Sequence, residues 1–290
     1  MNRIFKKILS VLLSASIIAA VFTGCSKVDE FTFCPANEKE SDVAVVSFNV
    51  AAPWGSLLKN TSTGARVKRF AVYMNAVKPD SVGTQEMNSD WMKKLAELMP
   101  DYDSYGVVRG GDDNEKKSEM NSVFWLKDKY DCIDQNTFWL SETPDKESKF
   151  EGAGCYRVCS YVVLQSKETD LKYIHMNTHL DNASDEARVY GANVLLGKID
   201  ELKAQYPNTP IVLSGDFNDY ISGPASGVLA DELNVQSADT NTYHDWGKIT
   251  EGEPIDFIFT TGTIGDYQIL NDTTNGLVSD HYGIYQTIKF

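Results

Sequence analysis

Positive charge is scarce in this 290-residue sequence. Its 27 Lys and Arg residues stand against 41 Asp and Glu residues, which gives a formal net charge of −14 at pH 7. Because no basic tail offsets this charge, the protein would repel polyanions at long range, and we expect no tight non-specific nucleic-acid binding. Internal repeats and low-complexity tracts are also absent. An apolar share of 42% and an aromatic share of 11% suffice for one large core, or for two domains at most.

A hydrophobic run long enough to cross a membrane comfortably is missing too. The apolar stretch at residues 8–22 is short, follows Arg3, Lys6 and Lys7, and is soon followed by polar residues, which is typical of a secretory signal. Residues 22–25 read Phe-Thr-Gly-Cys and resemble the lipobox of bacterial lipoproteins, in which the cysteine is lipidated and becomes the new N-terminus. The alternative is an ordinary cleaved signal peptide beside a free cysteine.

These features divide the chain into three segments. Residues 1–24 are predicted to be a signal peptide, residues 25–41 a lipidated Cys25 with a polar tether, and residues 42–290 the folded domain. We therefore expect an exported protein, lipid-anchored at the bacterial cell envelope or surface. Loss of residues 1–24 removes three basic residues and no acidic one, so the formal charge would fall from −14 to −17.

Zinc-binding cysteine patterns are absent as well. Cys34, Cys132, Cys155 and Cys159 match no zinc spacing, although an exported protein permits disulfides. Their connectivity cannot be derived from the sequence. We interpret Cys155 and Cys159 as strand or turn residues that could pair.

The stretch IVLSGDFND at residues 211–219 organises the rest of the domain. Its apolar start predicts a short strand buried on both faces. The small residues Ser214 and Gly215 let the backbone turn, so that Asp216 and Asn218 project into one crevice. Such a crevice suits a hard cation or a polarised water molecule, whereas the plainer interpretation is an Asp/Asn-rich turn.

Hydrophobic periodicity predicts strands alternating with helices. Helices are expected at residues 66–77, 91–99 and 184–203, the last with Ser184 as its N-cap. Strands are expected at residues 42–48, 81–84, 104–108, 122–126, 157–165, 171–178, 211–213, 255–260, 264–270 and 282–289.

Chemically capable side chains recur where these strands end, which is where α/β folds assemble their sites. Each could also be an ordinary turn, capping or surface residue, but their number favours a functional site. They are Asn49, Glu86, His179, Asp216, Asn218, Asp256, Asp280 and His281.

Six short motifs identify a resemblance over residues 42–290. They occur in the order found in the endonuclease/exonuclease/phosphatase superfamily, which has the DNase I-like fold. Tyr282 stands where many of its members have proline, a departure that puts little in doubt. The motifs are Ser47-Phe48-Asn49, Gln85-Glu86, Asn177-Thr178-His179, Gly215-Asp216-Phe217-Asn218, Ile255-Asp256-Phe257-Ile258 and Ser279-Asp280-His281.

The resemblance implies a fold class and a reaction class. The fold would be a four-layered α/β sandwich, in which two packed mixed β-sheets are flanked by helices. The activity would be hydrolysis of a phosphate ester by in-line attack of water, with Mg²⁺, or alternatively Mn²⁺, as cofactor. Carboxylate and amide oxygens are the ligands that Mg²⁺ prefers.

Residue by residue, the resemblance implies a metal site and a set of side chains that bind the phosphate and the attacking water. Glu86 would be the main Mg²⁺ ligand, with Asn49 and Asp280 nearby. Asp216 and Asn218 would position the attacking water and a phosphate oxygen, and one or two metals are possible. His281, oriented by Asp256, would contact the scissile phosphate.

Further residues are placed around these by the same resemblance. His179 would be the second histidine, paired with Glu119 as the supporting acid. Arg109 and Arg157 would grip the substrate phosphate, unless they are surface salt-bridge partners. His175 is expected to be structural.

The substrate is less determined than the reaction, because this fold serves nucleases, phosphatases and sphingomyelinases. Net charge favours a small phosphorylated molecule or a lipid head group over long nucleic acid. The alternatives are a secreted endonuclease on DNA or RNA and an inert surface lipoprotein that only binds. We expect a monomer whose partners are the substrate and, through its lipid, the membrane.

Overall fold

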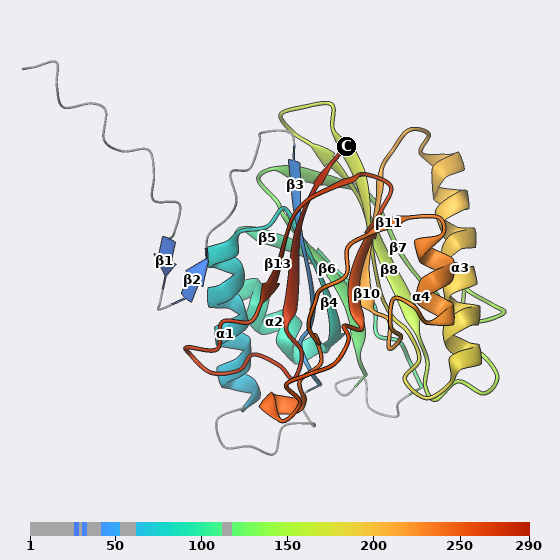
Figure 1. The fold of residues 1–290 in the computed structure, drawn as a ribbon. Coiled ribbons are helices and arrows are strands. Elements are labelled where there is room, and N and C mark those ends of the chain that lie inside the picture. Colours follow the sequence, from blue (N-terminus) through green and yellow to red (C-terminus); the bar gives the residue numbers. More distant parts are fainter. Residues whose placement is uncertain (1–25, 29–30, 34–41, 53–61, 112–117) are drawn as a thin grey trace, which may run out of the picture.

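The computed structural model describes residues 26–28, 31–33, 42–52, 62–111 and 118–290. Two mixed six-stranded sheets pack face to face, and helices cover the outer face of each sheet (Figure 1). The domain is therefore a four-layered α/β sandwich, which confirms the predicted fold class.

The first sheet has the strand order β13-β14-β3-β4-β6-β5. Its outer face packs against α1 (Thr63–Val77) and α2 (Ser89–Leu98), with Phe70 and Trp91 buried at the contact. The strands are β3 (Asp42–Asn49), β4 (Ser81–Met87), β5 (Tyr102–Tyr105), β6 (Met120–Leu126), β13 (Thr263–Leu270) and β14 (Gly283–Lys289).

The second sheet has the order β11-β12-β10-β9-β8-β7. Its outer face packs against α3 (Asp185–Gln205) and α4 (Pro224–Ala230), with Leu195 and Phe217 in the buried contact. The strands are β7 (Tyr130–Trp139), β8 (Val158–Ser166), β9 (Lys172–His179), β10 (Ile211–Asp216), β11 (Asn234–Val235) and β12 (Asp256–Thr260).

A third apolar cluster fills the space between the sheets. β-branched side chains from central strands of both sheets meet there, among them Val45 of β3, Val162 of β8 and Val212 of β10. Because these central strands are covered on both faces, they read as continuous apolar runs in the sequence rather than as alternating ones. This double burial explains why residues 211–213 predict a strand.

The element predictions were right for the long, regular segments. Helix α3 begins after Ser184, whose side chain accepts a hydrogen bond from the Ala187 N–H at 3.1 Å, as the predicted N-cap requires. The sequence analysis did not predict β7 or α4. Strand β7 lies at a sheet edge, and most of its side chains outside its last few residues are exposed or half-buried, so it lacks an apolar pattern. Helix α4 has seven residues, too few for a helical period to show.

The region before the sandwich is described in part. A short antiparallel hairpin of β1 (Ser26–Val28) and β2 (Phe31–Phe33) lies within the segment expected to be a tether. The predicted signal peptide, Cys25 and Cys34 lie outside the described residues. Among the helices that the structure describes, none has the length and apolar character needed to cross a membrane.

Strand pairing places the polar strand ends together. The parallel pair β9 and β10 aligns His179 with Asp216, and the antiparallel pair β10 and β12 aligns Asp216 with Asp256. In the other sheet, the parallel pair β3 and β4 aligns Asn49 with Gln85. The carboxyl ends of β3, β4, β9 and β10 thus gather at one end of the sandwich, where an α/β fold places its ligand crevice.

Candidate active site

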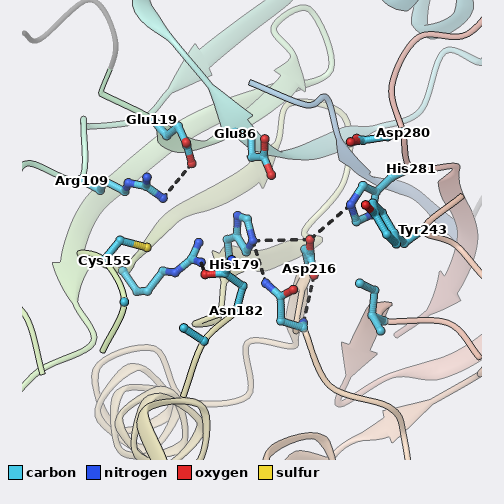
Figure 2. A pocket seen from close by; sticks show the side chains of 15 residues that line it. Glu86, Arg109, Glu119, Cys155, His179, Asn182, Asp216, Tyr243, Asp280 and His281 are labelled. Atoms are coloured by element: carbon cyan, nitrogen blue, oxygen red, sulfur yellow. Dashed lines mark hydrogen bonds and ion pairs between the residues drawn. The ribbon is translucent and has the colours of Figure 1, made fainter. Parts of the chain in front are cut away.

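A cavity of about 620 Å³ opens at this end of the sandwich. Figure 2 shows Glu119, Arg109 and Cys155 on one side of the cavity and Asp280, His281 and Tyr243 on the other. Most of the residues that were predicted from the sequence line it. The full lining is Glu86, Arg109, Glu119, Gly154, Cys155, Arg157, His179, Asn182, Ala183, Asp216, Asn218, Tyr243, Ile255, Asp280 and His281.

Glu86 reaches the cavity because β4 bulges at its end. The register between β4 and β6 shifts between Thr84 and Met87, and Glu86 itself has a φ of 60°. Such a bulge redirects a side chain relative to its neighbours in the strand. The Glu86 carboxylate accepts hydrogen bonds from Asn49 Nδ2 at 3.1 Å and from the Ala52 N–H at 2.6 Å. Glu86 is therefore held in place from two sides.

Asp280 faces the same part of the cavity as Glu86 (Figure 2). Burial raises the pKa of the Asp280 carboxyl; the nearby His281 lowers it, and Glu86 raises it. Two partly buried carboxyl groups that repel each other favour a nearby cation, and oxygen donors suit Mg²⁺ or Mn²⁺. The side chains present fit the divalent metal that the sequence predicts.

Asn49 serves as a bridge at the end of β3. Its Nδ2 donates to Glu86 and, at 2.9 Å, to Asp216 Oδ2, while its Oδ1 accepts from the Ala51 N–H at 3.0 Å. Since β3 and β10 belong to different sheets, the bond to Asp216 joins the two halves of the sandwich at the site.

Asp216 lies at the centre of the polar cluster and is 2% exposed. Its Oδ1 accepts from the Asn218 N–H at 2.9 Å, and its Oδ2 lies 3.5 Å from His179 Nε2 and 3.7 Å from His281 Nε2. Burial raises the pKa of the Asp216 carboxyl, and the charge of Asp256 raises it further. A buried carboxylate with a raised pKa is a good proton acceptor.

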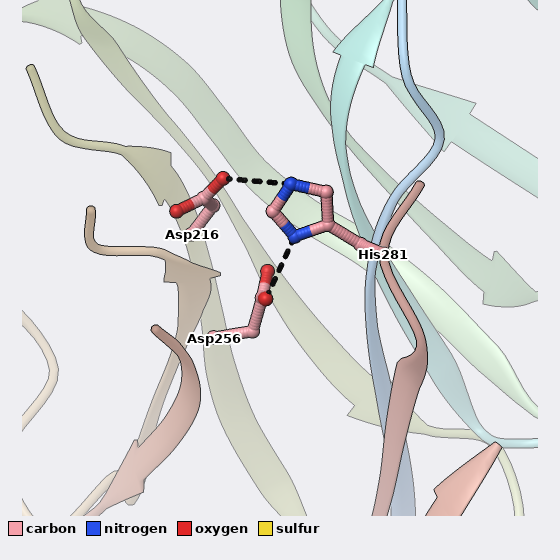
Figure 3. A group of neighbouring side chains, drawn as sticks. All are labelled: Asp216, Asp256 and His281. Carbon is pink, nitrogen blue, oxygen red and sulfur yellow. Dashed lines mark hydrogen bonds and ion pairs between the residues drawn. The ribbon is translucent and has the colours of Figure 1, made fainter. Parts of the chain in front are cut away.

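His281 is fixed by a second carboxylate. Its Nδ1 lies 2.9 Å from Asp256 Oδ2, which confirms the predicted orientation by Asp256 (Figure 3). Burial alone would lower the pKa of His281, but Asp256 and Asp216 together raise it above its usual value. The imidazole is therefore held in its protonated form. Ligand atoms of Asp216, Asp256 and His281 lie within 4.8 Å of one another, close enough to hold a metal ion.

The pKa of His179 shifts in the opposite direction to that of His281. Burial lowers its pKa, and the nearby positive charges of Arg157 and Arg109 lower it further, so His179 stays neutral. Its Nε2 lies 2.9 Å from Asn218 Nδ2, and since that amide nitrogen can only donate, Nε2 accepts.

The predicted pairing of His179 with Glu119 is wrong. His179 Nδ1 is buried without a hydrogen-bond partner in the described part of the chain, and the Glu119 carboxylate binds Arg109 at 2.7 Å. Arg109 and Glu119 approach each other from the two sides of the 112–117 segment. The sequence gives no spacing that would have revealed this ion pair.

The side of the cavity away from Asp280 is built by Asp181, a residue that the sequence analysis missed. Its buried carboxylate accepts from the backbone N–H groups of Gly154 at 3.0 Å and Ala183 at 2.9 Å, and lies 3.7 Å from Arg157 Nε. Arg157 Nη2 in turn donates to Asn182 Oδ1 at 3.1 Å. Asp181 and Asn182 follow the end of β9 after Leu180, so the strand-end signal that found His179 could also have found them.

Other polar residues singled out in the sequence serve the structure. Asp219 accepts from the N–H groups of Ala225 and Ser226 in the first turn of α4, so it is a capping residue. His175 is fully buried between Ser81 Oγ at 2.8 Å and Ser214 Oγ at 2.9 Å, which supports a structural role.

The cysteines of the domain carry free thiols. Cys132, Cys155 and Cys159 are all unpaired, so Cys155 and Cys159 do not form the disulfide that the sequence left open. Cys159 is buried in β8, whereas Cys155 lies in the loop before it and lines the cavity.

The chain matches known proteins over most of its length. Residues 46–281 match the sequence model of the Endonuclease/Exonuclease/phosphatase family. No curated protein matches the chain.

Several solved structures share the fold over nearly their whole length. A Bacteroides thetaiotaomicron family protein has a TM-score of 0.78 and 27% identity, covering 87% of this chain and 99% of that one. A Bacteroides vulgatus protein has a TM-score of 0.77 and 29% identity, with 87% and 100% covered. A mannosyl-6-phosphatase of Bacteroides thetaiotaomicron VPI-5482 has a TM-score of 0.77 and 28% identity, with 86% and 100% covered.

Proposed function

Because the chain belongs to the Endonuclease/Exonuclease/phosphatase family, whose members are phosphoric ester hydrolases, we propose that it is a divalent-metal-dependent phosphoesterase. The observation that carries the proposal is the convergence of a carboxylate pair, Glu86 and Asp280, with two histidines of opposite charge state in one cavity.

Glu86 and Asp280 would hold the cation, with Asn49 beside them to fix Glu86. A bound Mg²⁺ would neutralise charge on the phosphoryl oxygens. We assign the Asp216, Asp256 and His281 cluster to proton chemistry instead, because a protonated imidazole has no lone pair to give to a metal.

The chain's own residues divide the remaining work. Asp216 accepts the proton of the attacking water, since its pKa is raised and its second oxygen is fixed by Asn218. His281, protonated and held by Asp256, donates a hydrogen bond to a phosphoryl oxygen as negative charge builds there. Neutral His179 and the Leu180 carbonyl accept hydrogen bonds from Asn218 Nδ2 and so fix this side chain beside Asp216.

Metal dependence is tested by removal and replacement of the ion. Protein treated with EDTA should lose its activity on bis-p-nitrophenyl phosphate and p-nitrophenyl phosphate, and Mg²⁺ or Mn²⁺ should restore it. Glu86→Gln, which keeps the shape but removes the charge, should stay inactive at the same metal concentrations. Full activity in EDTA, or restoration by Zn²⁺ alone, would contradict the proposal. No hydrolysis under any condition would favour the inert lipoprotein.

The choice of substrate class is supported by the charges that line the cavity, because its arginines are paired with carboxylates. Arg109 is paired with Glu119, and Arg157 with Asp181, so the arginines do not form a free basic row for successive phosphates. Together with a relative described as a mannosyl-6-phosphatase, this favours a small phosphorylated molecule, with a sugar phosphate as the first candidate.

A substrate panel distinguishes the candidates. Sugar phosphates, inositol phosphates, sphingomyelin, RNA and plasmid DNA are assayed side by side with Mg²⁺. We expect turnover of the sugar phosphates. Efficient plasmid cleavage at physiological salt without turnover of small substrates would instead make the protein a nuclease.

We also propose that Cys25 anchors the mature protein to the membrane through lipid. The proposal rests on the basic start, the short apolar run and the Thr-Gly-Cys ending of the N-terminal segment. Cys25→Ser should release the protein or stop its processing, as membrane fractionation and N-terminal analysis would show. A variant that stays membrane-bound with an unchanged N-terminus would rule the anchor out.

A further inference from the structure

Arg66 is an arginine with 0% exposure, close enough to Asp280 and Glu86 for both carboxylates to raise its pKa. It lies in the first turn of α1, and within the described part of the chain its guanidinium donates hydrogen bonds to backbone carbonyls. Nη2 donates to Ala51 O at 3.0 Å, and Nη1 donates to both Val50 O and Val278 O. A fully buried arginine is rare and costly in free energy. One that binds only backbone oxygens among the described residues therefore indicates a specific structural role.

The three carbonyls belong to two segments. One segment follows β3 and hydrogen-bonds Glu86, and the other contains Asp280. Val50 and Ala51 directly follow Asn49, and the Ala51 N–H and Ala52 N–H bind Asn49 and Glu86 respectively. Val278 lies two residues before Asp280 in the other segment. A single planar guanidinium thus fixes the distance between the segment that hydrogen-bonds Glu86 and the backbone just before Asp280.

The guanidinium is itself held between two aromatic rings. Its central carbon lies 5.2 Å from the Trp91 ring centroid and 5.3 Å from that of Trp246. Trp91 belongs to α2 and is buried, whereas Trp246 lies half-buried in η2 (Asp245–Gly247). Burial lowers the pKa of Arg66 to about 10, and Asp280 and Glu86 act in the opposite direction, so the group remains charged at neutral pH.

We infer that Arg66 is a positioning residue for the metal centre: by clamping the ends of both segments it sets the separation of Glu86 and Asp280, and hence the affinity for the divalent cation. This inference rests on the proposed function. It also has an electrostatic rival, because a positive charge behind two carboxylates should by itself weaken cation binding. Loss of the clamp should weaken Mn²⁺ binding in Arg66→Lys and in Arg66→Met. The charge effect alone would leave binding unchanged in Arg66→Lys and would tighten it in Arg66→Met.

The experiment measures Mn²⁺ affinity by titration calorimetry on the EDTA-stripped, re-dialysed protein without substrate. Arg66→Lys keeps the charge but cannot span three carbonyls, and Arg66→Met removes both. Positioning predicts that both variants bind Mn²⁺ about 10-fold to 100-fold more weakly, the range for residues that orient metal ligands. Lys68→Met, which removes an exposed charge from the same helix, should keep the wild-type Kd.

The inference would be overturned if folded Arg66→Lys bound Mn²⁺ as tightly as the wild type. It would also be overturned if Arg66→Met bound Mn²⁺ more tightly while Arg66→Lys was unchanged. A merely structural role would lower the melting temperature in EDTA without changing the Kd of the folded protein, and would overturn it too. If the Arg66 variants do not fold, Trp246→Leu removes one ring of the sandwich and leaves the carbonyls in place. It should weaken Mn²⁺ binding severalfold, and an unchanged Kd would contradict the inference.

Failure of the proposed function gives a different result. Glu86→Gln is titrated in parallel, and it should lose Mn²⁺ binding. If the wild type takes up no Mn²⁺, or Glu86→Gln binds as the wild type does, then the assigned metal site is wrong and the inference falls with it.

Discussion

His179 and His281 line one cavity but hold opposite charge states, because their neighbours differ. His179 faces two arginines, whereas His281 lies between two aspartates. The charge on His281 thus depends on Asp256, which contacts it directly at 2.9 Å. Burial lowers the pKa of both imidazoles, and their different charged neighbours then separate the two charge states.

Replacement of Asp256 by asparagine tests this dependence. Asp256→Asn keeps the shape but removes the charge, so the pKa of His281 should fall and kcat should drop by about 10²-fold or more. NMR titration of the His281 ring and steady-state kinetics measure the two effects. His281→Ala in the Asp256→Asn background should cost little more, since the pair acts as a unit. A near wild-type kcat in folded Asp256→Asn would remove Asp256 from the mechanism.

His175 makes stability depend on pH. Burial lowers its pKa from 6.5 to about 3, so the folded protein keeps it neutral while the unfolded chain protonates it below pH 6.5. Its contribution is therefore complete above pH 6.5 and is lost as the pH falls toward 3, at up to about 1.4 kcal/mol per pH unit.

Denaturant unfolding of the wild type and of His175→Gln isolates this contribution. The variant has no group to titrate at this position, so the stability difference between the two proteins should shrink as the pH falls from 6.5 to 4. Other titrating groups are common to both and cancel. A difference that stays constant over this range would show that His175 does not control the acid sensitivity.

The residue scale is also where sequence prediction reached its limit. Asp256 and His281 were matched correctly because short motifs carry both. Glu119 was matched with the wrong partner, because no local sequence pattern shows that its carboxylate lies next to Arg109 rather than His179. Asn49 shows the same limit, since the sequence did not reveal that its amide links two carboxylates.

At the scale of elements, the contact between β4 and β10 depends on the absence of a side chain at Gly83. A Cβ built there would lie 2.1 Å from Ser214 Oγ and 2.7 Å from Asn177 Oδ1. These two groups belong to the second sheet and to a hydrogen-bonded network, in which Asn177 Oδ1 also accepts from Gln85 Nε2 at 2.7 Å. A larger residue at Gly83 would push the sheets apart next to the site.

Gly83→Ala should therefore destabilise the protein by about 1–3 kcal/mol, as overpacking of a core does. Gly197→Ala is the matched control, because this glycine lies within α3 and nothing within 4 Å would meet its Cβ. That variant should be stabilised by up to about 1 kcal/mol, the helix propensity gain of alanine. Chemical denaturation measures both, and equal effects of the two substitutions would contradict the packing argument.

Elements could be predicted from the sequence where one signal was repeated over many residues. Helix α3 has 21 residues and a side-chain cap, and β10 is a fully buried run. Strand β7 has ten residues, but its pairing is irregular between Cys132 and Asp134, and charged side chains interrupt its pattern. Its pairing with β8, rather than any local preference, makes it a strand.

At the scale of the whole molecule, the layer order followed from the family resemblance and not from composition. Apolar content indicated one large core, whereas the structure divides that core into three clusters around two sheets. Periodicity cannot show which buried faces meet, because a strand covered on both sides has no preferred face in the sequence. Most of the predicted site residues lie together for a simpler reason: strand ends converge in this topology whatever the packing between layers.

The hydrogen bond between Asn49 and Asp216 makes catalytic competence a late event in folding. The two residues are 167 positions apart and lie in different sheets, so the site exists only after both sheets have formed and docked. Contacts so distant in sequence carry a large entropic cost and form slowly. After dilution from denaturant, far-ultraviolet circular dichroism should recover before hydrolytic activity does. Simultaneous recovery would mean that the two halves of the sandwich assemble as one cooperative unit.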